Sequence, residues 1–428
     1  MLAKVFIVFA ALLALCIPVS VTMGISALLP KLISPAFPAN VAFLVRQCVG
    51  GVDSTPILAL PLFVLSGIIM ARGEISYKIF NVFSYFGGRR TGGLPCAVVV
   101  TCLFYGAISG SGPATTAAVG AMTIPLLVKL GYDRVFVTSL VAVSGGLGVI
   151  IPPSIPFIIY GLSSGESVGK LFLAGIIPGL LIGACLMAYA WYYCKSRGED
   201  KEKLEAYCNE LHKKGLVKIL KESFFALMTP VIILGGIYGG VVTPTEAACV
   251  SVFYALIVCC FIDKTLKFKE VIEIFREAVN TYAPVLFIIA SATAFARVLT
   301  MMQAPQTIAA GITSIVSGKI AVLILINILL IGVGMVMDTT PAILILTPIL
   351  LPLAKEVGVD AVHFGIIMVV NLAIGFVTPP VGINLYVASS MTKIPVMTIA
   401  RAAFPFIVAF SLALVAITFI PAISLALL

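Results

Sequence analysis

The chain has 428 residues, of which 61% are hydrophobic and only 11% are charged. This balance and a mean hydropathy of +1.17 exclude a soluble globular protein and predict a polytopic membrane protein. The net charge of +9 does not indicate nucleic-acid binding, because the Lys and Arg residues stand between the apolar segments. We therefore expect an all-α fold embedded in a lipid bilayer.

A helix needs about 20 apolar residues to cross a hydrocarbon layer that is about 30 Å thick. By this criterion the sequence predicts nine crossings, at residues 4–28, 55–72, 132–164, 169–194, 224–240, 245–262, 280–298, 361–391 and 395–425. The first is too long for a signal peptide and lacks a small-residue cleavage site, so we interpret it as a retained helix. Two crossings are interrupted by Pro-Pro pairs, at Pro152-Pro153 and Pro379-Pro380.

Two other apolar stretches, 92–129 and 318–356, each carry a small polar run with a proline in the middle. The arms on either side have about 16 residues, which is short for a crossing, so the pattern predicts re-entrant helical hairpins. Amphipathic segments at 74–88 and 299–316 precede the hairpins and suit helices lying flat in the interface. The segment 195–222 carries charges of both signs and is predicted to be a solvated connecting loop.

The two halves of the chain repeat one another at an offset of 227 residues. Gly148-Val149-Ile150-Ile151-Pro152-Pro153 recurs as Gly375-Phe376-Val377-Thr378-Pro379-Pro380, and the same offset carries Asp133 onto Asp360. Each half then consists of two crossings, an arm, a hairpin, an interrupted crossing and a last crossing. Segment 224–240 has no counterpart in this scheme and adds one crossing, so we expect inverted repeats.

The distribution of basic residues predicts an orientation. If the N-terminus is cytoplasmic, 21 of the 27 Lys and Arg residues fall on the inner side, as the positive-inside rule requires. This arrangement places the hairpin 92–129 at the cytoplasmic face, the hairpin 318–356 at the outer face and the C-terminus outside.

Four interruptions of helices are expected near the middle of the membrane, two at hairpin tips and two at Pro-Pro pairs. Irregular backbone at that depth persists only when it is buried in protein or lines a wet cavity. We expect Pro113, Pro341, Pro152 and Pro379 to start new helices, with Thr340 and Thr378 as N-caps. Helix N-termini present free N–H groups that suit a carboxylate, while carbonyl and hydroxyl oxygens suit Na⁺.

The candidate site residues follow from these four places. The substrate-binding candidates are Ser111, Gly112, Pro113, Thr340, Pro341, Pro153, Pro380 and Asn384. The Na⁺-binding candidates are Ser109, Gly110, Ser144, Gly148, Asp338, Thr339, Asn371, Gly375 and Thr378. Two alternatives stay open: the glycines and serines could serve helix packing, and Asp338 could cap the second arm of its hairpin.

Other chemistry has little support in the sequence. Gly110-Ser111-Gly112 lacks the lysine of a phosphate-binding loop, so the sequence predicts no use of ATP. An intramembrane serine protease would need a base near Ser109 or Ser111, but of the two histidines His212 lies in the predicted loop and His363 near the outer mouth of a crossing. We expect no catalytic residues and no enzyme.

The motifs together resemble the large membrane subunit, DctM- or SiaM-like, of tripartite ATP-independent periplasmic (TRAP) transporters. The resemblance covers essentially the whole chain and is carried by Gly106–Ala117, Gly148–Ser154, Thr243–Ala248, Met337–Pro341 and Thr378–Gly382. It implies Na⁺-driven uptake of organic acids across a bacterial inner membrane by an elevator motion. C4-dicarboxylates, sialic acid, other sugar acids and keto acids are the implied substrates.

The resemblance also implies partners and a division of the chain. A small four-helix membrane subunit (DctQ- or SiaQ-like) and a periplasmic substrate-binding protein (DctP- or SiaP-like) would work with it. The expected parts are scaffold and first arm (1–91), first transport-domain repeat (92–194), cytoplasmic loop (195–222), scaffold and second arm (223–317) and second transport-domain repeat (318–428).

Two competing interpretations remain at this point. The chain could be a stand-alone Na⁺/carboxylate carrier that needs no binding protein, or a structural membrane protein without transport activity.

Overall fold

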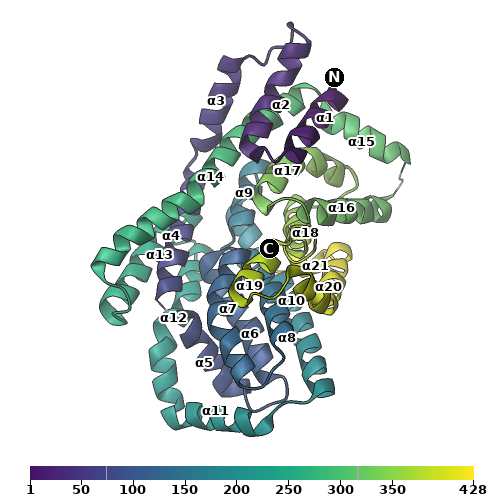
Figure 1. The fold of residues 1–428 in the computed structure, drawn as a ribbon. Helices are drawn as coiled ribbons and strands as arrows, with labels where there is room; N and C mark the ends of the chain where they lie inside the picture. The colour runs from purple at the N-terminus through teal and green to yellow at the C-terminus, as the bar shows by residue number, and fades with distance from the viewer. Residues whose placement is uncertain (74, 316–317) are drawn as a thin grey trace.

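The computed structural model describes residues 1–73, 75–315 and 318–428, which form helices joined by short turns, with no strand among them. Six of these helical segments are long and apolar enough to cross a membrane by length and composition, and the longest is Lys269–Met301. The prediction of an all-α, multi-span membrane protein is confirmed. Figure 1 shows the arrangement of the helices.

The first half of the chain contains α1 (Leu2–Ala14), α2 (Val19–Ile33), α3 (Val41–Val52), η1 (Thr55–Leu58), α4 (Ala59–Arg72), α5 (Ile75–Gly87), α6 (Gly93–Ser109), α7 (Gly112–Lys129), α8 (Arg134–Gly145), η2 (Gly146–Val149), α9 (Ile155–Ser164) and α10 (Val168–Arg197). The second half contains α11 (Lys201–Lys214), α12 (Leu216–Tyr238), α13 (Pro244–Leu256), η3 (Ile257–Ile262), α14 (Phe268–Met301), α15 (Ala304–Ile315), α16 (Lys319–Gly334), α17 (Thr339–Glu356), α18 (Ala361–Gly375), α19 (Ile383–Thr392), α20 (Val396–Phe419) and α21 (Ala422–Leu425).

The predicted single crossing at 4–28 is wrong. The segment forms two short helices, α1 and α2, which pack against each other across a turn in which Cys16 has φ of +58°. Pro18 explains the break, because a proline disfavours the α conformation in the residue before it and removes a backbone N–H. Helix α3 was also missed, since its 12 residues are fewer than a crossing needs.

The connection between the halves is more ordered than predicted. The expected loop 195–222 contains helix α11 and the first turns of α12, so 224–240 is only part of a 23-residue helix. At the 227-residue offset, residues 229–238 of α12 fall on residues 2–11 of α1, so the expectation that this segment lacks a counterpart is wrong. The offset also carries α7, 112–129, onto α17, 339–356.

The N-terminus and helix α11 lie at opposite ends of the molecule (Figure 1). The predicted topology placed the N-terminus and residues 195–222 on the same side, so this part of the prediction is wrong. The physical reason is the first segment: two packed helices, α1 and α2, replace the one crossing on which the count depended.

The predicted arms are helices, with shifted bounds. Helix α5 covers Ile75–Gly87 and α15 covers Ala304–Ile315, while α14 continues to Met301, beyond the predicted end of its crossing at 298. The predicted limits at residues 74 and 316 lie outside the described residues.

Two groups of helices can be distinguished by their packing, and one continuous hydrophobic core runs through both. In the first group, the 34-residue helix α14 packs against α2, α3 and α4, and α13 packs against α4. In the second, α6, α7 and α8 pack together, α16 packs on α18, and α20 packs on α8 and α10. Every residue of α18 is buried, so this helix lies at the core of the second group.

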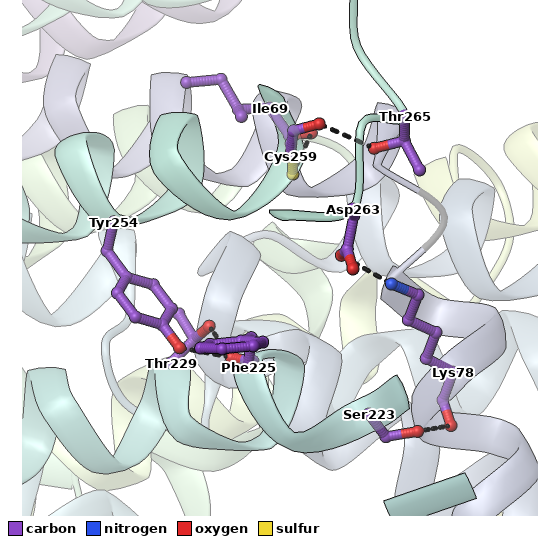
Figure 2. A network of polar contacts seen from close by, with 9 residues as sticks. All are labelled: Ile69, Lys78, Ser223, Phe225, Thr229, Tyr254, Cys259, Asp263 and Thr265. Carbon is purple, nitrogen blue, oxygen red and sulfur yellow. Dashed lines mark hydrogen bonds and ion pairs between the residues drawn. The ribbon is translucent and has the colours of Figure 1, made fainter. Parts of the chain in front are cut away.

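Arm α5 is fixed to the first group by a small polar network (Figure 2). The Lys78 ammonium lies 2.6 Å from Asp263 Oδ2 in the turn after η3, and both side chains are mostly buried. The Ser223 hydroxyl of α12 donates to the backbone carbonyl of Lys78 at 2.9 Å. Helix α5 is thus held both by α12 and by the turn after η3.

We predict that Asp263→Asn lowers the stability of the protein by about 1–3 kcal/mol, because it leaves the Lys78 ammonium poorly solvated and without its charged partner. The midpoint of thermal unfolding in detergent measures the effect. Lys203→Met is the matched control, since the Lys203–Asp200 pair is largely exposed and should contribute about 0–1 kcal/mol. Equal shifts for both variants would contradict an anchoring role for Asp263.

Candidate functional site

The first hairpin tip is a tight turn between α6 and α7. Gly110 ends α6 with φ of +61°, a conformation that glycine adopts without strain. Ser111 is the N-cap of α7 and makes no side-chain capping bond, and Pro113 lies in the first turn, as predicted. The hydroxyls of Ser109 and Thr115 are 2.9 Å apart, and Thr115 donates to the Ser111 carbonyl at 2.8 Å.

The first Pro-Pro interruption lies directly against this tip. Helix α8 passes into the turn η2, a cis Pro152–Pro153 bond follows, and α9 begins at Ile155. The backbone N–H of Ile155 donates to the Gly110 carbonyl at 3.3 Å. A Cβ on Gly148 would lie 2.3 Å from the Thr115 hydroxyl, so the two elements touch through a glycine.

The second hairpin tip joins α16 to α17, and Asp338 is the N-cap of α17. Asp338 Oδ1 accepts bonds from the backbone N–H and the hydroxyl of Thr339, at 2.7 and 3.3 Å, and the residue is exposed. The capping role left open for Asp338 is therefore present. Thr340 lies inside the first turn and is not the N-cap, contrary to the prediction, whereas Pro341 stands at the start of the arm as expected.

The second Pro-Pro interruption contacts the second tip in the same manner. Helix α18 ends at Gly375, the Pro379–Pro380 bond is cis, and the backbone N–H of Val381 donates to the Met335 carbonyl at 3.1 Å. A Cβ on Gly375 would lie 2.3 Å from the carbonyl carbon of Gly334. Each tip is thus held by the interrupted helix of its own half.

The prolines of the Pro-Pro pairs do not start the next helices, as had been predicted for Pro152 and Pro379. A residue before proline is disfavoured in the α conformation, so the helices begin later. Helix α9 starts after Ser154, whose hydroxyl accepts from Phe157 N–H at 3.4 Å, and α19 starts after Gly382. Thr378 is not a cap either: its hydroxyl donates back to the Ile374 carbonyl at 2.8 Å.

Contacts between the halves bring the four interruptions together. Asn384 of α19 donates to the Ala142 carbonyl of α8 at 3.1 Å. A Cβ on Gly112 would lie 3.1 Å from the Phe376 ring, and one on Gly146 would lie 3.5 Å from the Ala373 carbonyl. The site candidates at these four places, including Pro153 and Pro380, therefore form one assembly.

Asn371 is the exception among the predicted site residues. Its amide donates to Asn327 of α16 at 2.8 Å, and Thr418 of α20 donates to the same Asn327 oxygen at 3.3 Å. These partners place Asn371 in a polar cluster between α16, α18 and α20. Its amide oxygen, Oδ1, is buried and has no hydrogen-bond partner among the described residues, so its place among the Na⁺ candidates stays a prediction.

Two kinds of unused polar groups face this assembly. Among the described residues, Ser144 Oγ and Asn384 Oδ1 are buried and have no hydrogen-bond partner. Helices α7 and α19 begin without a side-chain cap, whereas Ser154 caps α9 and Asp338 caps α17. Oxygen atoms of this kind suit a hard monovalent cation, and uncapped N-termini suit an anion.

Two contributors were missing from the sequence-based site. Thr115 contacts Ser109 and Gly148, and Ser154 caps α9. The signal for Ser154 was present in Ser154-Ile155-Pro156, a capping residue followed by a proline in the first turn. For Thr115, the signal was its place one helical turn after Ser111.

Comparisons with known proteins agree with this architecture. Residues 6–423 match the family model described as "Tripartite ATP-independent periplasmic transporter, DctM component". The C4-dicarboxylate TRAP transporter large permease protein DctM of Pseudomonas aeruginosa is 40% identical, over 82% of this chain and 81% of its own length. The sialic acid TRAP transporter large permease protein SiaM of Vibrio cholerae is 38% identical, over 86% and 85%.

A further relative is a longer protein. The isethionate TRAP transporter permease protein DctMQ of Oleidesulfovibrio alaskensis is 44% identical over 93% of this chain, which spans only 62% of that protein. Among solved structures, the YdaH transporter of Alcanivorax borkumensis is similar in fold, with a TM-score of 0.63 and 14% identity over 90% of both chains.

We predict that Gly375→Ala destabilises the protein by about 1–3 kcal/mol, because its methyl group would overlap the backbone of Gly334. Thermal unfolding in detergent measures this loss. Gly332→Ala on α16 is the control, because a methyl group at this position would have no neighbouring atom from outside the helix within 4 Å. Alanine there should leave the stability unchanged or raise it by up to about 1 kcal/mol. If Gly375→Ala behaved like the control, the close approach of α16 and α18 would not matter for stability.

Proposed function

Because the chain belongs to the DctM family of tripartite ATP-independent periplasmic transporters, we propose that it is the large membrane subunit of a Na⁺-coupled uptake system for small organic acid anions. The observation that carries this proposal is the meeting of four helix interruptions in one assembly, with uncapped N-termini and free oxygen atoms side by side. Such half-helix ends bind substrate and coupling ion in secondary transporters.

The proposed Na⁺ ligands come from both halves. In the first, the hydroxyls of Ser109 and Ser144 and the backbone at Gly110 and Gly148 supply oxygen atoms. In the second, Asp338, Thr339 and Thr378 and the backbone at Gly375 do so. Hard cations prefer such all-oxygen surroundings, and the free, buried Ser144 hydroxyl supports the assignment.

The proposed substrate site uses the uncapped N-termini of α7 and α19. Ser111 and Gly112 begin α7, and Asn384 lies in the first turn of α19. These ends carry a partial positive charge that attracts an acid group. The relatives are named for isethionate, C4-dicarboxylate and sialic acid, all of which carry one.

We propose two partners, a small membrane subunit and a periplasmic binding protein. The relatives named "large permease protein" support a smaller permease subunit, and the longer DctMQ relative supports it further. The family description itself names a periplasmic, ATP-independent system, which is consistent with delivery of substrate by a soluble protein.

The α11 end is proposed to face the cytoplasm of a bacterium, in the inner membrane. Residues 195–221 carry eight Lys and Arg residues, which favours the inner side. The N-terminus, at the opposite end, would then be periplasmic.

The two halves are proposed to be inverted repeats that work by an elevator motion. The base of the α6–α7 hairpin is bonded next to α11, where Glu199 accepts from Gly92 N–H and Tyr132 O–H. The base of the α16–α17 hairpin lies beside the distant end of α9, where Tyr160 donates to the Ala361 carbonyl at 2.6 Å. Inverted repeats require the bases of the two hairpins to lie at opposite ends of the molecule.

We predict that uptake by the assembled transporter in proteoliposomes depends on an imposed Na⁺ gradient. Undiminished uptake driven by a pH gradient, with K⁺ replacing Na⁺ on both sides, would overturn Na⁺ coupling.

Asp338→Asn should raise the Na⁺ concentration for half-maximal uptake about tenfold, because it replaces a charged oxygen ligand by a neutral one. Ser111→Ala should have a milder effect, since a neutral hydroxyl typically contributes only ~1 kcal/mol.

The elevator motion predicts that a crosslink across the boundary between the helix groups stops transport. Ala117 of α7 and Ile68 of α4 line one cavity, and cysteines at both positions should form such a link after the ten native cysteines are replaced. Activity should return on reduction. Full uptake by efficiently crosslinked protein would exclude a movement of α7 past α4.

A further inference from the structure

Two cavities lie at the boundary between the helix groups. The first, which we call the inner vestibule, has a volume of about 490 Å³ and lies between α4, α7 and α14. It is lined by Ser109 and Ser111 of the first tip and extends along α4 to Arg72. This cavity therefore joins the first hairpin tip to Arg72, the last residue of α4.

The second cavity, the outer vestibule, has a volume of about 360 Å³ and lies between α3, α9, α14 and α17. Its lining matches the inner vestibule through the repeat. Leu344 and Pro348 stand 227 residues after Ala117 and Ala121, while Gly50 and Ser54 stand 227 residues before Glu277 and Thr281. No residue of the second hairpin tip lines it, so it does not reach the proposed site.

Each vestibule is lined by one arginine, Arg72 in the inner and Arg297 in the outer. Arg72 Nη2 donates to Glu277 Oε2 at 2.5 Å, and both side chains are more than two-fifths exposed. An exposed pair of this kind is weak, and a single contact leaves most guanidinium N–H groups free. An incoming anion can therefore compete with Glu277 for Arg72.

The outer vestibule differs from the inner one in its charge. Gly50 occupies the repeat position of Glu277, and none of the described residues that line this cavity is acidic. Arg297 therefore faces the cavity without a competing carboxylate from its lining. A carboxylate or sulfonate would be bound more strongly there than at Arg72.

We propose that Arg297 and Arg72 are anion-binding residues at the two ends of the substrate path, and that Glu277 weakens the inner one so that substrate is released. Arg297 receives the organic acid on the outer side, and Arg72 contacts it between the first tip and the α11 side. This rests on the proposed function, since it assumes an anionic substrate and a cytoplasmic α11 end. It adds specificity-determining residues outside the four interruptions.

Binding to Arg72 can be measured without turnover, because its side chain is more than two-fifths exposed. The probes are succinate, isethionate and N-acetylneuraminate as potassium salts, against KCl at equal ionic strength. At least one should raise the unfolding temperature of the purified permease in a saturable manner. Arg72→Gln should raise the half-saturating concentration about tenfold, the effect of one hydrogen bond to a charged group.

Two variants separate a specific contact from general charge. Arg276→Gln changes a basic residue beside Glu277 that does not line the vestibule, and it should bind as the wild type does. Glu277→Gln removes the competitor and should tighten binding several-fold, which a merely structural role for the pair would not produce. Absence of any saturable shift in the wild type, or equal losses in Arg72→Gln and Arg276→Gln, would overturn the proposal.

The outer vestibule is tested by uptake with the assembled transporter. Arg297→Gln should reduce the initial rate about tenfold, while Arg46→Gln on α3, which does not line the cavity, should not. A side chain can be added at Gly50, because a Cβ there meets nothing within 4 Å. Gly50→Glu should therefore place a carboxylate near Arg297, as Glu277 is placed near Arg72, and slow uptake. Gly50→Gln, of equal size but neutral, should slow uptake less than Gly50→Glu does.

The results also distinguish this proposal from the proposed function. A wild type that binds the probes through Arg72 but shows no Na⁺-driven uptake would contradict the function and leave the anion site in place. A wild type that takes up substrate normally, with Arg297→Gln and Gly50→Glu unchanged, would contradict the outer half of this proposal alone.

Discussion

The structure depends on one constraint: backbone groups freed at a helix interruption must find partners where no water is at hand. The chain meets it by placing each hairpin tip against the interrupted helix of the same half. Ile155 N–H bonds the Gly110 carbonyl, and Val381 N–H bonds the Met335 carbonyl. These pairings require backbones to approach closely, which explains glycine at positions 148 and 375. Helix packing and ligand binding are therefore served by the same residues.

Some backbone N–H groups at the helix interruptions have no capping side chain, and these groups are the ones available to bind a ligand. Asp338 and Ser154 satisfy the ends of α17 and α9, so these ends have less to offer an anion. Helices α7 and α19 keep uncapped ends. Of the four helix ends, only these two remain as proposed binding positions for the substrate's acid group, and each half of the chain contributes one of them. The carboxylate of Asp338 adds negative charge at the second tip, where a cation is favoured over an acid group.

The sequence predicted the hairpins closely and the N-terminal region poorly, for different physical reasons. Long apolar arms around a polar proline-containing run have few alternatives, so 92–129 and 318–356 differ from the observed helices by one residue at their starts. Hydropathy alone does not detect a turn inside an apolar segment, so α1 and α2 were merged. One miscounted crossing then reversed the N-terminus relative to α11. A predicted topology is therefore sensitive to a single error, because adding or removing one crossing moves all segments on one side of it in the chain to the other side of the membrane.

The site residues divide in the same way. Proline and glycine positions fixed where the helices break, but capping depends on the geometry of the turn. Pro152 was expected to begin a helix, yet the residue before a second proline cannot readily be helical, and Ser154 took that role. Asn371 lies one turn before Gly375 on a helix that is buried on all sides, so hydropathy gave no indication of which neighbour it faces. Its partner, Asn327, could be identified only from the packing of α16 on α18.

The two arms are built differently, and this bears on how the proposed motion would be carried. Helix α5 is bound to α12 and the turn after η3 by Ser223 and Asp263, and it also packs on α6, the first helix of its own hairpin. Helix α15 packs mainly on α17, the second helix of the hairpin in its own half, and less on α14. At the end of α5, a Cβ on Gly93 would lie 1.9 Å from the Gly87 carbonyl, so this turn tolerates only glycine in its observed form. If the hairpins move together, the second half has to bend before its arm, between α14 and α15, whereas in the first half α5 is joined both to α12 and to its own hairpin. Matching helix bounds thus do not imply matching hinges: the side on which each arm is anchored decides where the chain has to flex.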